Sequence, residues 1–210
     1  MSLLELIEQQ GQQVARAQQE MRETLDKLHE SNAKLSEEIE ERWRAERRLR
    51  LLCETMSRRD TSLSERIVLM LREACADLDL EVGILARIDG DKYTVVHSWA
   101  DDPEKLDHLQ PGTSRALEDT FCRALDRDGT SIGIEDIRNS DWKNTPAYLK
   151  SHMETYLGVC VALHGEFWGS LCFIDLSPRN KPFNPPDHDF LRLLAQWIGS
   201  ELSLRYPNNE

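Results

Sequence analysis

The stretch YLGVCVALHGEFWGSLCFID, residues 156–175, decides the fold. It predicts two β-strands joined by a short turn at residues 164–166, where a glycine lets the chain reverse. Side chains alternate between the two faces of a strand. One face of the first strand is aliphatic and consists of Leu157, Val159, Val161 and Leu163. The second strand is expected to place Phe167, Leu171 and Phe173 on one face and Trp168, Ser170, Cys172 and Ile174 on the other.

Neither face of this hairpin is polar, so both faces are expected to be covered by other parts of the chain. A hairpin in an antiparallel sheet more often leaves one face in water. One of the two faces also carries mostly small side chains. Small residues on a covered face either let a helix approach closely or leave room for a ligand, and the sequence leaves both interpretations open.

This hairpin belongs to a longer series of segments, with GTSIGIEDIRNSDWKNTPAY at residues 129–148 and LAQWIGSEL at residues 194–202. The series resembles the GAF domain, a small-molecule-sensing and dimerising module of bacterial signalling proteins, over residues 61–205. The resemblance implies an α+β fold, a GAF/PAS-like antiparallel sheet of about six strands flanked by helices. The expected domains are a coiled-coil signalling helix (1–59), a GAF domain (60–206) and a tail (207–210).

The first 59 residues contain one glycine and no proline, and their apolar residues recur at intervals of seven. This heptad pattern predicts a parallel coiled coil and therefore a homodimer. The expected dimerisation positions are Leu25, Leu28, Asn32, Leu35, Ile39, Leu49 and Met56. Asn32 is a polar residue in the seam, which costs stability and favours a parallel dimer in register. The alternative is a single solvated helix, because Glu, Arg and Gln are so frequent.

Part of this arm, ESNAKLSEEIEERWRAERRLRLL at residues 30–52, resembles the signalling helices that join sensory modules to one another or to kinase and cyclase domains. That resemblance implies a helix that transmits a signal. Ser62 and Glu65 form a capping-box pattern, so a second helix is expected to begin a few residues after the arm ends.

The rest of the domain is expected to contain a helix over residues 62–78, strands over 82–88 and 93–99, and a short strand over 130–134. Residues 114–125 are expected to form a helix over the ligand side of the sheet, with Ala116, Leu117, Phe121 and Leu125 facing inward. Asn184 is expected to cap a final helix that begins with proline. That helix is expected to pack beside the 62–78 helix, on the face opposite the pocket.

The resemblance implies a ligand cavity closed by residues 128–156. Trp142, Tyr148 and Tyr156 are the expected aromatic walls, and His152 and Asp136 the expected polar contacts. Two cysteines, Cys122 and Cys172, complete the candidate site. The alternative is that the same side chains fill the core and bind no ligand.

Cys122 admits two interpretations. It is either a reactive thiol, which would bind a ligand, sense oxidation or serve as the nucleophile of a small thiol-based enzyme, or a small apolar residue against the sheet. The enzyme alternative follows from a resemblance, because some GAF-like proteins reduce methionine sulfoxide. GAF domains that carry a bilin attach it through a cysteine in the capping region. No cysteine lies between residues 122 and 160, so the resemblance does not imply covalent bilin attachment. A lone histidine such as His152 does not predict haem, and the spacing of cysteines and histidines predicts no metal site.

Composition excludes further classes. The net charge is −12 with no basic stripe, so no nucleic-acid partner is expected. The sequence contains no run of about 18 apolar residues, so no membrane span is expected. The five cysteines lie mostly in apolar runs, which favours a reducing cytoplasm over a disulfide framework.

These observations predict a cytoplasmic, non-enzymatic sensory and dimerisation module of a bacterial signalling protein, of the histidine kinase or diguanylate cyclase type. It would bind a small ligand in the GAF pocket and act on an effector protein or domain through the coiled coil. The alternatives are the thiol-based enzyme and a purely structural dimeriser. The sequence leaves open the ligand, the effector and the direction of signalling.

Overall fold

The computed structural model describes residues 3–57, 60–106, 108–126 and 128–206, with side chains from residue 10 onward except at positions 56 and 106. The chain divides into two compact units, Met1–Arg47 and Arg48–Glu210. Helix α1 (Leu3–Ser57) makes up the described part of the first unit and contributes the first residues of the second.

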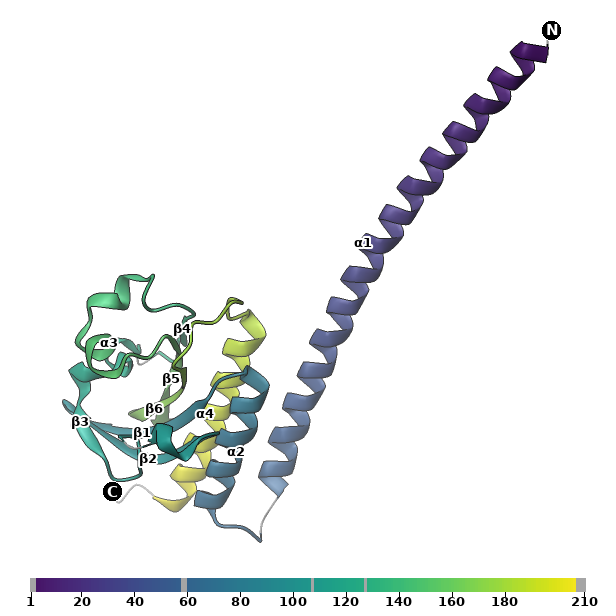
Figure 1. Ribbon diagram of the computed structural model, residues 1–210. Coiled ribbons are helices and arrows are strands. Elements are labelled where there is room, and N and C mark those ends of the chain that lie inside the picture. The colour runs from purple at the N-terminus through teal and green to yellow at the C-terminus, as the bar shows by residue number, and fades with distance from the viewer. Residues whose placement is uncertain (1–2, 58–59, 107, 127, 207–210) are drawn as a thin grey trace. The chain divides into compact units, whose positions relative to one another are not determined.

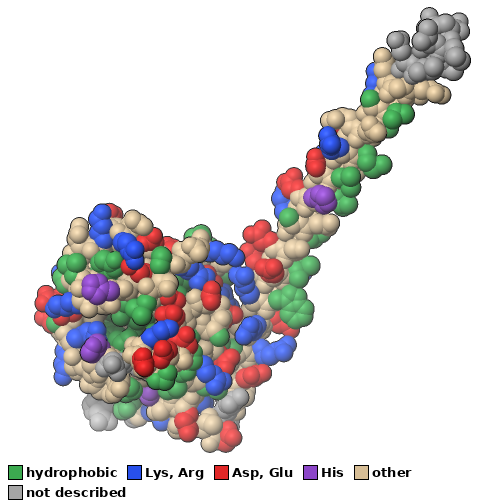
Figure 2. Space-filling view, viewed as in Figure 1, with side chains coloured by type: hydrophobic (Ala, Val, Ile, Leu, Met, Phe, Trp, Pro, Cys, Tyr) green, Lys and Arg blue, Asp and Glu red, His purple; other side chains and the backbone are tan. Residues whose placement is uncertain are grey.

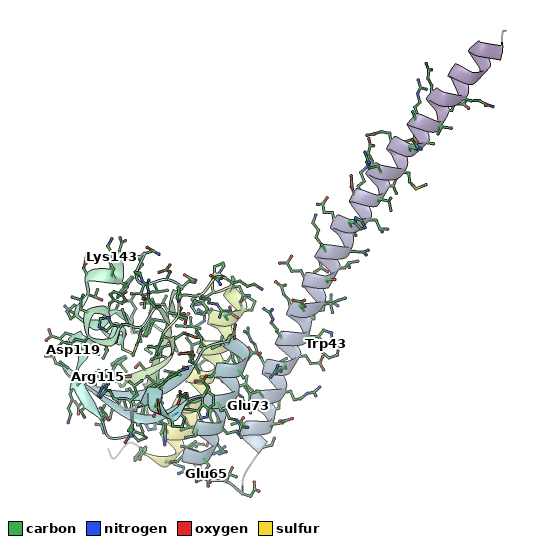
Figure 3. The ribbon with its side chains drawn as sticks, viewed as in Figure 1. Trp43, Glu65, Glu73, Arg115, Asp119 and Lys143 are labelled. Atoms are coloured by element: carbon green, nitrogen blue, oxygen red, sulfur yellow. The ribbon has the colours of Figure 1, made fainter. Side chains whose placement is uncertain are left out.

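In the first unit, α1 carries exposed apolar side chains on its heptad positions. Figure 2 shows hydrophobic side chains along one side of the arm. Four of the expected dimerisation residues are about half exposed in the single chain: Leu25, Leu28, Leu35 and Ile39. Trp43, labelled in Figure 3, is 67% exposed. The side chain of Met56 lies outside the described residues.

The second unit is built on one antiparallel sheet with the strand order β3-β2-β1-β6-β5-β4. The expected fold class is therefore confirmed. The strands are β1 (Val82–Asp89), β2 (Lys92–Ala100), β3 (Ser114–Ala116), β4 (Ile132–Ile134), β5 (Thr155–Leu163) and β6 (Glu166–Asp175). The hairpin quoted first, β5–β6, lies inside the sheet, and β6 also pairs with β1 along Val82–Arg87.

Each face of the sheet is covered by a different layer (Figure 1). Helices α2 (Leu63–Leu78) and α4 (Pro185–Arg205) cover one face and bury Leu157, Leu171 and Phe173 against it. The other face, with Tyr156, Cys172 and Ile174, lies under a cap. The cap consists of α3 (Pro146–Ser151) and the 3-10 helices η1 (Pro103–Leu106), η2 (Leu117–Asp119), η3 (Phe121–Ala124) and η4 (Asp141–Asn144).

Both covering helices begin where the sequence predicts. Ser62 caps α2, and its side chain and that of Glu65 form the reciprocal pair of a capping box. Asn184 caps α4 in the same way with Asp187, and proline occupies the first turn. Gly199 then allows α4 to lie against β5, because a Cβ at that position would overlap the backbone of Ala162.

The expected alternation of the second strand is wrong at its start. Phe167 packs under the cap, and Trp168 packs on the helix-covered face. The cause is a β-bulge: Val161 pairs with Gly169 and Ala162 with Phe167, so Trp168 is an extra residue without a cross-strand partner. One extra residue moves the side chains that precede it in the strand to the opposite face of the sheet.

The expected helix over residues 114–125 is also wrong. The segment forms strand β3 and then the two short 3-10 helices η2 and η3. Ser114–Ala116 pairs with the edge of β2, where the hydroxyls of Thr94 and Ser114 are 2.9 Å apart. Thr120 is extended, with φ −130° and ψ 150°, and separates the two 3-10 helices. Pairing with a strand 20 residues away therefore overrides the local helical pattern.

Arg48 fastens the last turns of α1 to the helical layer through a buried guanidinium group. Its Nε lies 2.6 Å from Asp77 of α2 and its Nη2 2.5 Å from Asp187 of α4. Its Nη1 donates to the carbonyl of Pro186 at 2.8 Å, and the group lies 4.8 Å from the ring centre of Phe190. All three charged side chains are under 10% exposed. The guanidinium thus has partners from two helices in a site with little water.

We expect Arg48→Met to destabilise the chain by about 3–5 kcal/mol, because it leaves two buried carboxylates without a cation. Urea denaturation at fixed protein concentration measures this difference. Arg44→Ala is the matched control, since Arg44 pairs with Glu40 at 3.8 Å on an exposed helix surface. Such a pair contributes under about 1 kcal/mol. Equal losses in the two variants would contradict this account of Arg48.

Candidate functional site

The candidate site lies between the sheet and the cap and contains two adjoining cavities. The inner cavity has a volume of about 30 Å³, and Cys122, Tyr93, Tyr156 and Cys172 are among its walls. The outer cavity is a groove of about 430 Å³. The two share six lining residues: Leu109, Arg115, Asp119, Ser151, Met153 and Ile174. The inner space holds about one water molecule, whereas the outer groove falls in the range of small-molecule sites.

Tyr156 determines how small the inner cavity is. Its ring is buried and lies over Gly158 two residues along the same strand, so that a Cβ at position 158 would overlap the phenol oxygen. Phe121 of η3 contacts the same ring, with 5.3 Å between ring centres. The small residue on this face thus makes room for the protein's own aromatic side chain.

Cys122 is the centre of a buried hydrogen-bond network. The hydroxyl of Tyr156 donates to Cys122 Sγ at 3.5 Å, and the hydroxyl of Ser170 donates to it at 3.3 Å. Tyr156 comes from β5 and Ser170 from β6. The sulfur of Cys122, which belongs to the cap, therefore accepts hydrogen bonds from two strands of the sheet.

These contacts separate the acidities of the two thiols. The interaction with the Cys172 thiol, helped by the hydrogen bonds from Ser170 and Tyr156, lowers the pKa of Cys122 below its ordinary value despite burial. The same interaction, together with burial, raises the pKa of Cys172 well above its ordinary value. Burial also raises the pKa of Tyr93 and Tyr156. The two hydroxyl donors therefore favour the thiolate form of Cys122.

Charged side chains surround the outer groove. Arg115 and Asp119, labelled in Figure 3, line both cavities. Arg115 donates to the backbone carbonyl of His108, and Lys150 of α3 forms an ion pair with Asp119 at 2.6 Å. These contacts hold the loop after η1, η2 and α3 together at the mouth of the groove.

The structure brings three of the seven expected site residues together, namely Cys122, Tyr156 and Cys172. Trp142 packs on the outer side of Phe121, with 6.1 Å between ring centres. The hydroxyl of Tyr148 donates to a carboxylate oxygen of Glu154 at 3.2 Å.

Two expected polar contacts lie outside the walls of both cavities. Asp136 accepts hydrogen bonds from the backbone and side chain of Asn139 within one turn. His152 is exposed and ends α3 in the left-handed conformation, with φ 53°.

Several residues that line the cavities or bond to Cys122 are not among the predicted site residues, for example Tyr93, Arg115, Ser170 and Met153. Ser170 is two positions before Cys172, so strand alternation alone places it on the same face. Arg115 carried no such signal, because its position depends on the pairing of β3 with β2.

Neither of two further kinds of site is present in the described part of the chain. No group of three or more His, Cys, Asp or Glu residues there is arranged to hold a metal ion. None of the helices among those residues is long and apolar enough to cross a membrane.

Comparisons with known proteins agree with this architecture. A family model described as "GAF domain" matches residues 60–202. The GAF domain of a phosphoenolpyruvate-protein phosphotransferase from Acinetobacter superposes with a TM-score of 0.59 at 16% identity, covering 77% of this chain and 94% of that one. The phycoerythrobilin-bound GAF domain of a cyanobacterial phytochrome gives 0.59 at 13% identity, covering 76% and 94%. At such identities the likeness shows the fold alone. No curated protein matches the chain.

We expect Gly158→Ala to destabilise the chain by about 1–3 kcal/mol, because the added methyl group forces Tyr156 out of its place. Chemical denaturation measures the difference. Gly11→Ala is the matched control: nothing lies within 4 Å of a Cβ there, so the change should stabilise the helix by about 0.5–1 kcal/mol. If the two variants are equally stable, Tyr156 does not lie over Gly158.

Proposed function

Because the chain belongs to the GAF domain family, we propose that it is a sensory and dimerisation module of a signalling protein. A small ligand enters the groove under the cap, and α1 carries the resulting change to an effector. The observation that carries this proposal is the pair of adjoining cavities between cap and sheet. The inner one is closed by side chains that a ligand can displace, and the outer one is already open.

The chemistry of the groove supports a ligand with an apolar body and a polar group. Leu109, Met153 and Ile174 supply apolar contact along the boundary of the two cavities. Arg115 lies at the same boundary, where its guanidinium can meet an anionic or carbonyl oxygen. Mostly apolar walls with a few placed polar groups are typical of small-molecule sites.

The exposed heptad residues of α1 support dimerisation with a second copy of this chain. Apolar side chains 47–64% exposed recur over four heptads: Val14, Met21, Leu25, Leu28, Leu35 and Ile39. Burying each of them against an identical helix would contribute on the order of 1 kcal/mol. Asn32 pairs with its copy only when the helices are parallel and in register.

The attachment of α1 supports transmission. Arg48 bonds to α2 and to α4, the two helices that cover the sheet. Leu51 and Leu52 of α1 pack against the same buried core. A rearrangement of the helical layer on ligand binding therefore changes the contacts of α1 directly. Coupling of this kind typically amounts to about 1–3 kcal/mol.

The effector in this proposal is a protein or domain of the histidine kinase or diguanylate cyclase type, in the bacterial cytoplasm. The alternative is a purely structural dimeriser. The small volume of the inner cavity, about 30 Å³, favours this alternative. The experiments below separate the two.

The oligomeric state tests the coiled coil. We expect the double variant Leu28→Asp/Leu35→Asp to be monomeric, because it places charges in the seam, while the wild type is a dimer. Sedimentation equilibrium gives both masses. Ala33→Asp is the matched control, since it adds a charge on the outer side of the same helix and should leave the dimer intact. A double variant that remains dimeric would remove the coiled coil from the proposal.

Ligand binding is tested by native mass spectrometry and absorption spectroscopy of freshly purified protein. We expect a dimer with added mass, and an occupancy at least about tenfold lower in Arg115→Ala, because a charge-assisted hydrogen bond is lost. Lys143→Ala is the matched control, since Lys143 is exposed and lines neither cavity. Two results together would identify the structural dimeriser: the dimer carries no added mass, and no extract of small molecules shifts its melting temperature.

A further inference from the structure

Two thiols from different layers of the fold meet at the inner cavity. Cys122 lies on η3 in the cap, and Cys172 lies on β6 in the centre of the sheet. Both side chains are buried, 4% and 2% exposed, and both line the cavity of about 30 Å³. A cavity of this size places the two side chains next to each other across the boundary between cap and sheet. Two cysteines must lie this close before a disulfide can join them.

The surroundings give the two thiols different roles. The hydroxyls of Tyr156 and Ser170 both donate to the sulfur of Cys122. Donors that converge on one sulfur stabilise its thiolate, which is the nucleophilic form. Cys172 lines the same cavity, and its interaction with Cys122, together with burial, raises the pKa of its thiol well above the ordinary value. One cysteine is thus prepared to react with an oxidant and the other to react with the product.

The remaining cysteines lack this arrangement. Burial raises the pKa of Cys75 and of Cys160, which makes both poor nucleophiles. Cys53 is exposed on α1. The chain therefore contains internal controls for any reaction at the pair.

A small oxidant has a route to the pair. The inner cavity shares Arg115, Ser151 and Met153 with the outer groove. The cavity has room for about one water molecule, and hydrogen peroxide is only slightly larger. Bulkier reagents do not fit without displacing Tyr156 or the cap.

We propose that Cys122 and Cys172 form a redox site, which hydrogen peroxide converts to a disulfide between the cap and the central strand. The Cys122 thiolate attacks one peroxide oxygen, breaks the O–O bond and becomes a sulfenic acid, while the leaving hydroxide takes a proton and becomes water. The Cys172 thiol then attacks the sulfenic sulfur and releases a second water. Overall, two thiols and one hydrogen peroxide give a disulfide and two waters.

The product would tie η3 to β6 and fix the cap over the inner cavity. A dithiol reductant regenerates the two thiols by thiol–disulfide exchange, in which it reduces the protein disulfide and becomes a disulfide itself. The site responds to oxidant whether or not the groove binds a ligand. The inference therefore goes beyond the proposed ligand sensing and does not rest on it.

The test uses the full chain, reduced with dithiothreitol, freed of the reductant and exposed to hydrogen peroxide. We expect the intact mass to fall by two hydrogen atoms, peptide mapping to find Cys122 linked to Cys172, and dithiothreitol to restore the mass. The Cys53→Ser variant removes the exposed thiol, which competes by forming intermolecular disulfides, and should give the same linkage. Both cysteines remaining reduced, or Cys122 passing to sulfinic acid without a disulfide, would overturn the proposal.

A second measurement separates the two roles. In Cys172→Ser the sulfenic acid on Cys122 has no partner, so we expect dimedone, added in denaturant after the peroxide is removed, to label Cys122 at least tenfold more than in the wild type. Cys160→Ser is the matched control and should keep the disulfide. Circular dichroism verifies that each variant is folded. If Cys172→Ser is unfolded, the disulfide map of the wild type alone decides whether Cys122 and Cys172 form the redox site. Equal labelling of Cys122 in folded Cys172→Ser and wild type would contradict a resolving role for Cys172.

Discussion

Both faces of the central hairpin β5–β6 are buried over residues 155–161 and 169–174, and this constraint organises the second unit. Leu157, Leu171 and Phe173 are fully buried on one face, where each contributes about 1.5–3 kcal/mol. Tyr156 and Cys172 are almost as completely buried on the other face. A single layer of helices can satisfy only one face. The chain therefore needs the cap, and the candidate site exists because the cap is built from short irregular segments that pack less continuously than α2 and α4.

The site combines a filled apolar core with an open groove. Tyr156 and Phe121 fill the space under the cap, as in an ordinary core, whereas the groove beside it stays open. The cluster around Cys122 is polar in a region that is otherwise apolar. Buried polar clusters cost stability unless every donor has an acceptor. Here the sulfur of Cys122, which belongs to the cap, accepts from the hydroxyls of Tyr156 on β5 and Ser170 on β6, so the two layers meet without leaving these hydroxyls unpaired.

The sequence predicts the parts of this architecture that depend on local chemistry. The caps at Ser62 and Asn184, the turn at Gly165 and the apolar faces of β5 follow from rules that span a few residues. The failures are non-local. No pattern within residues 114–125 reveals that Ser114 pairs with β2, and nothing around Trp168 reveals that β5 leaves it unpaired. The same limit applies to the site, since Cys122 and Cys172 were both selected, but their contact depends on how the cap folds over the sheet.

Asp187 uses its two carboxylate oxygens for different purposes. Oδ2 accepts the backbone N–H of Asn184 and so closes the first turn of α4, while Oδ1 accepts the guanidinium of Arg48. The order of that turn and the docking of α1 are therefore thermodynamically linked, and the linkage is reciprocal. The intact turn stabilises the attachment of Arg48 by the same free energy by which the attached Arg48 stabilises the turn. A force that pulled Arg48 away from α4 would accordingly loosen the first turn of that helix.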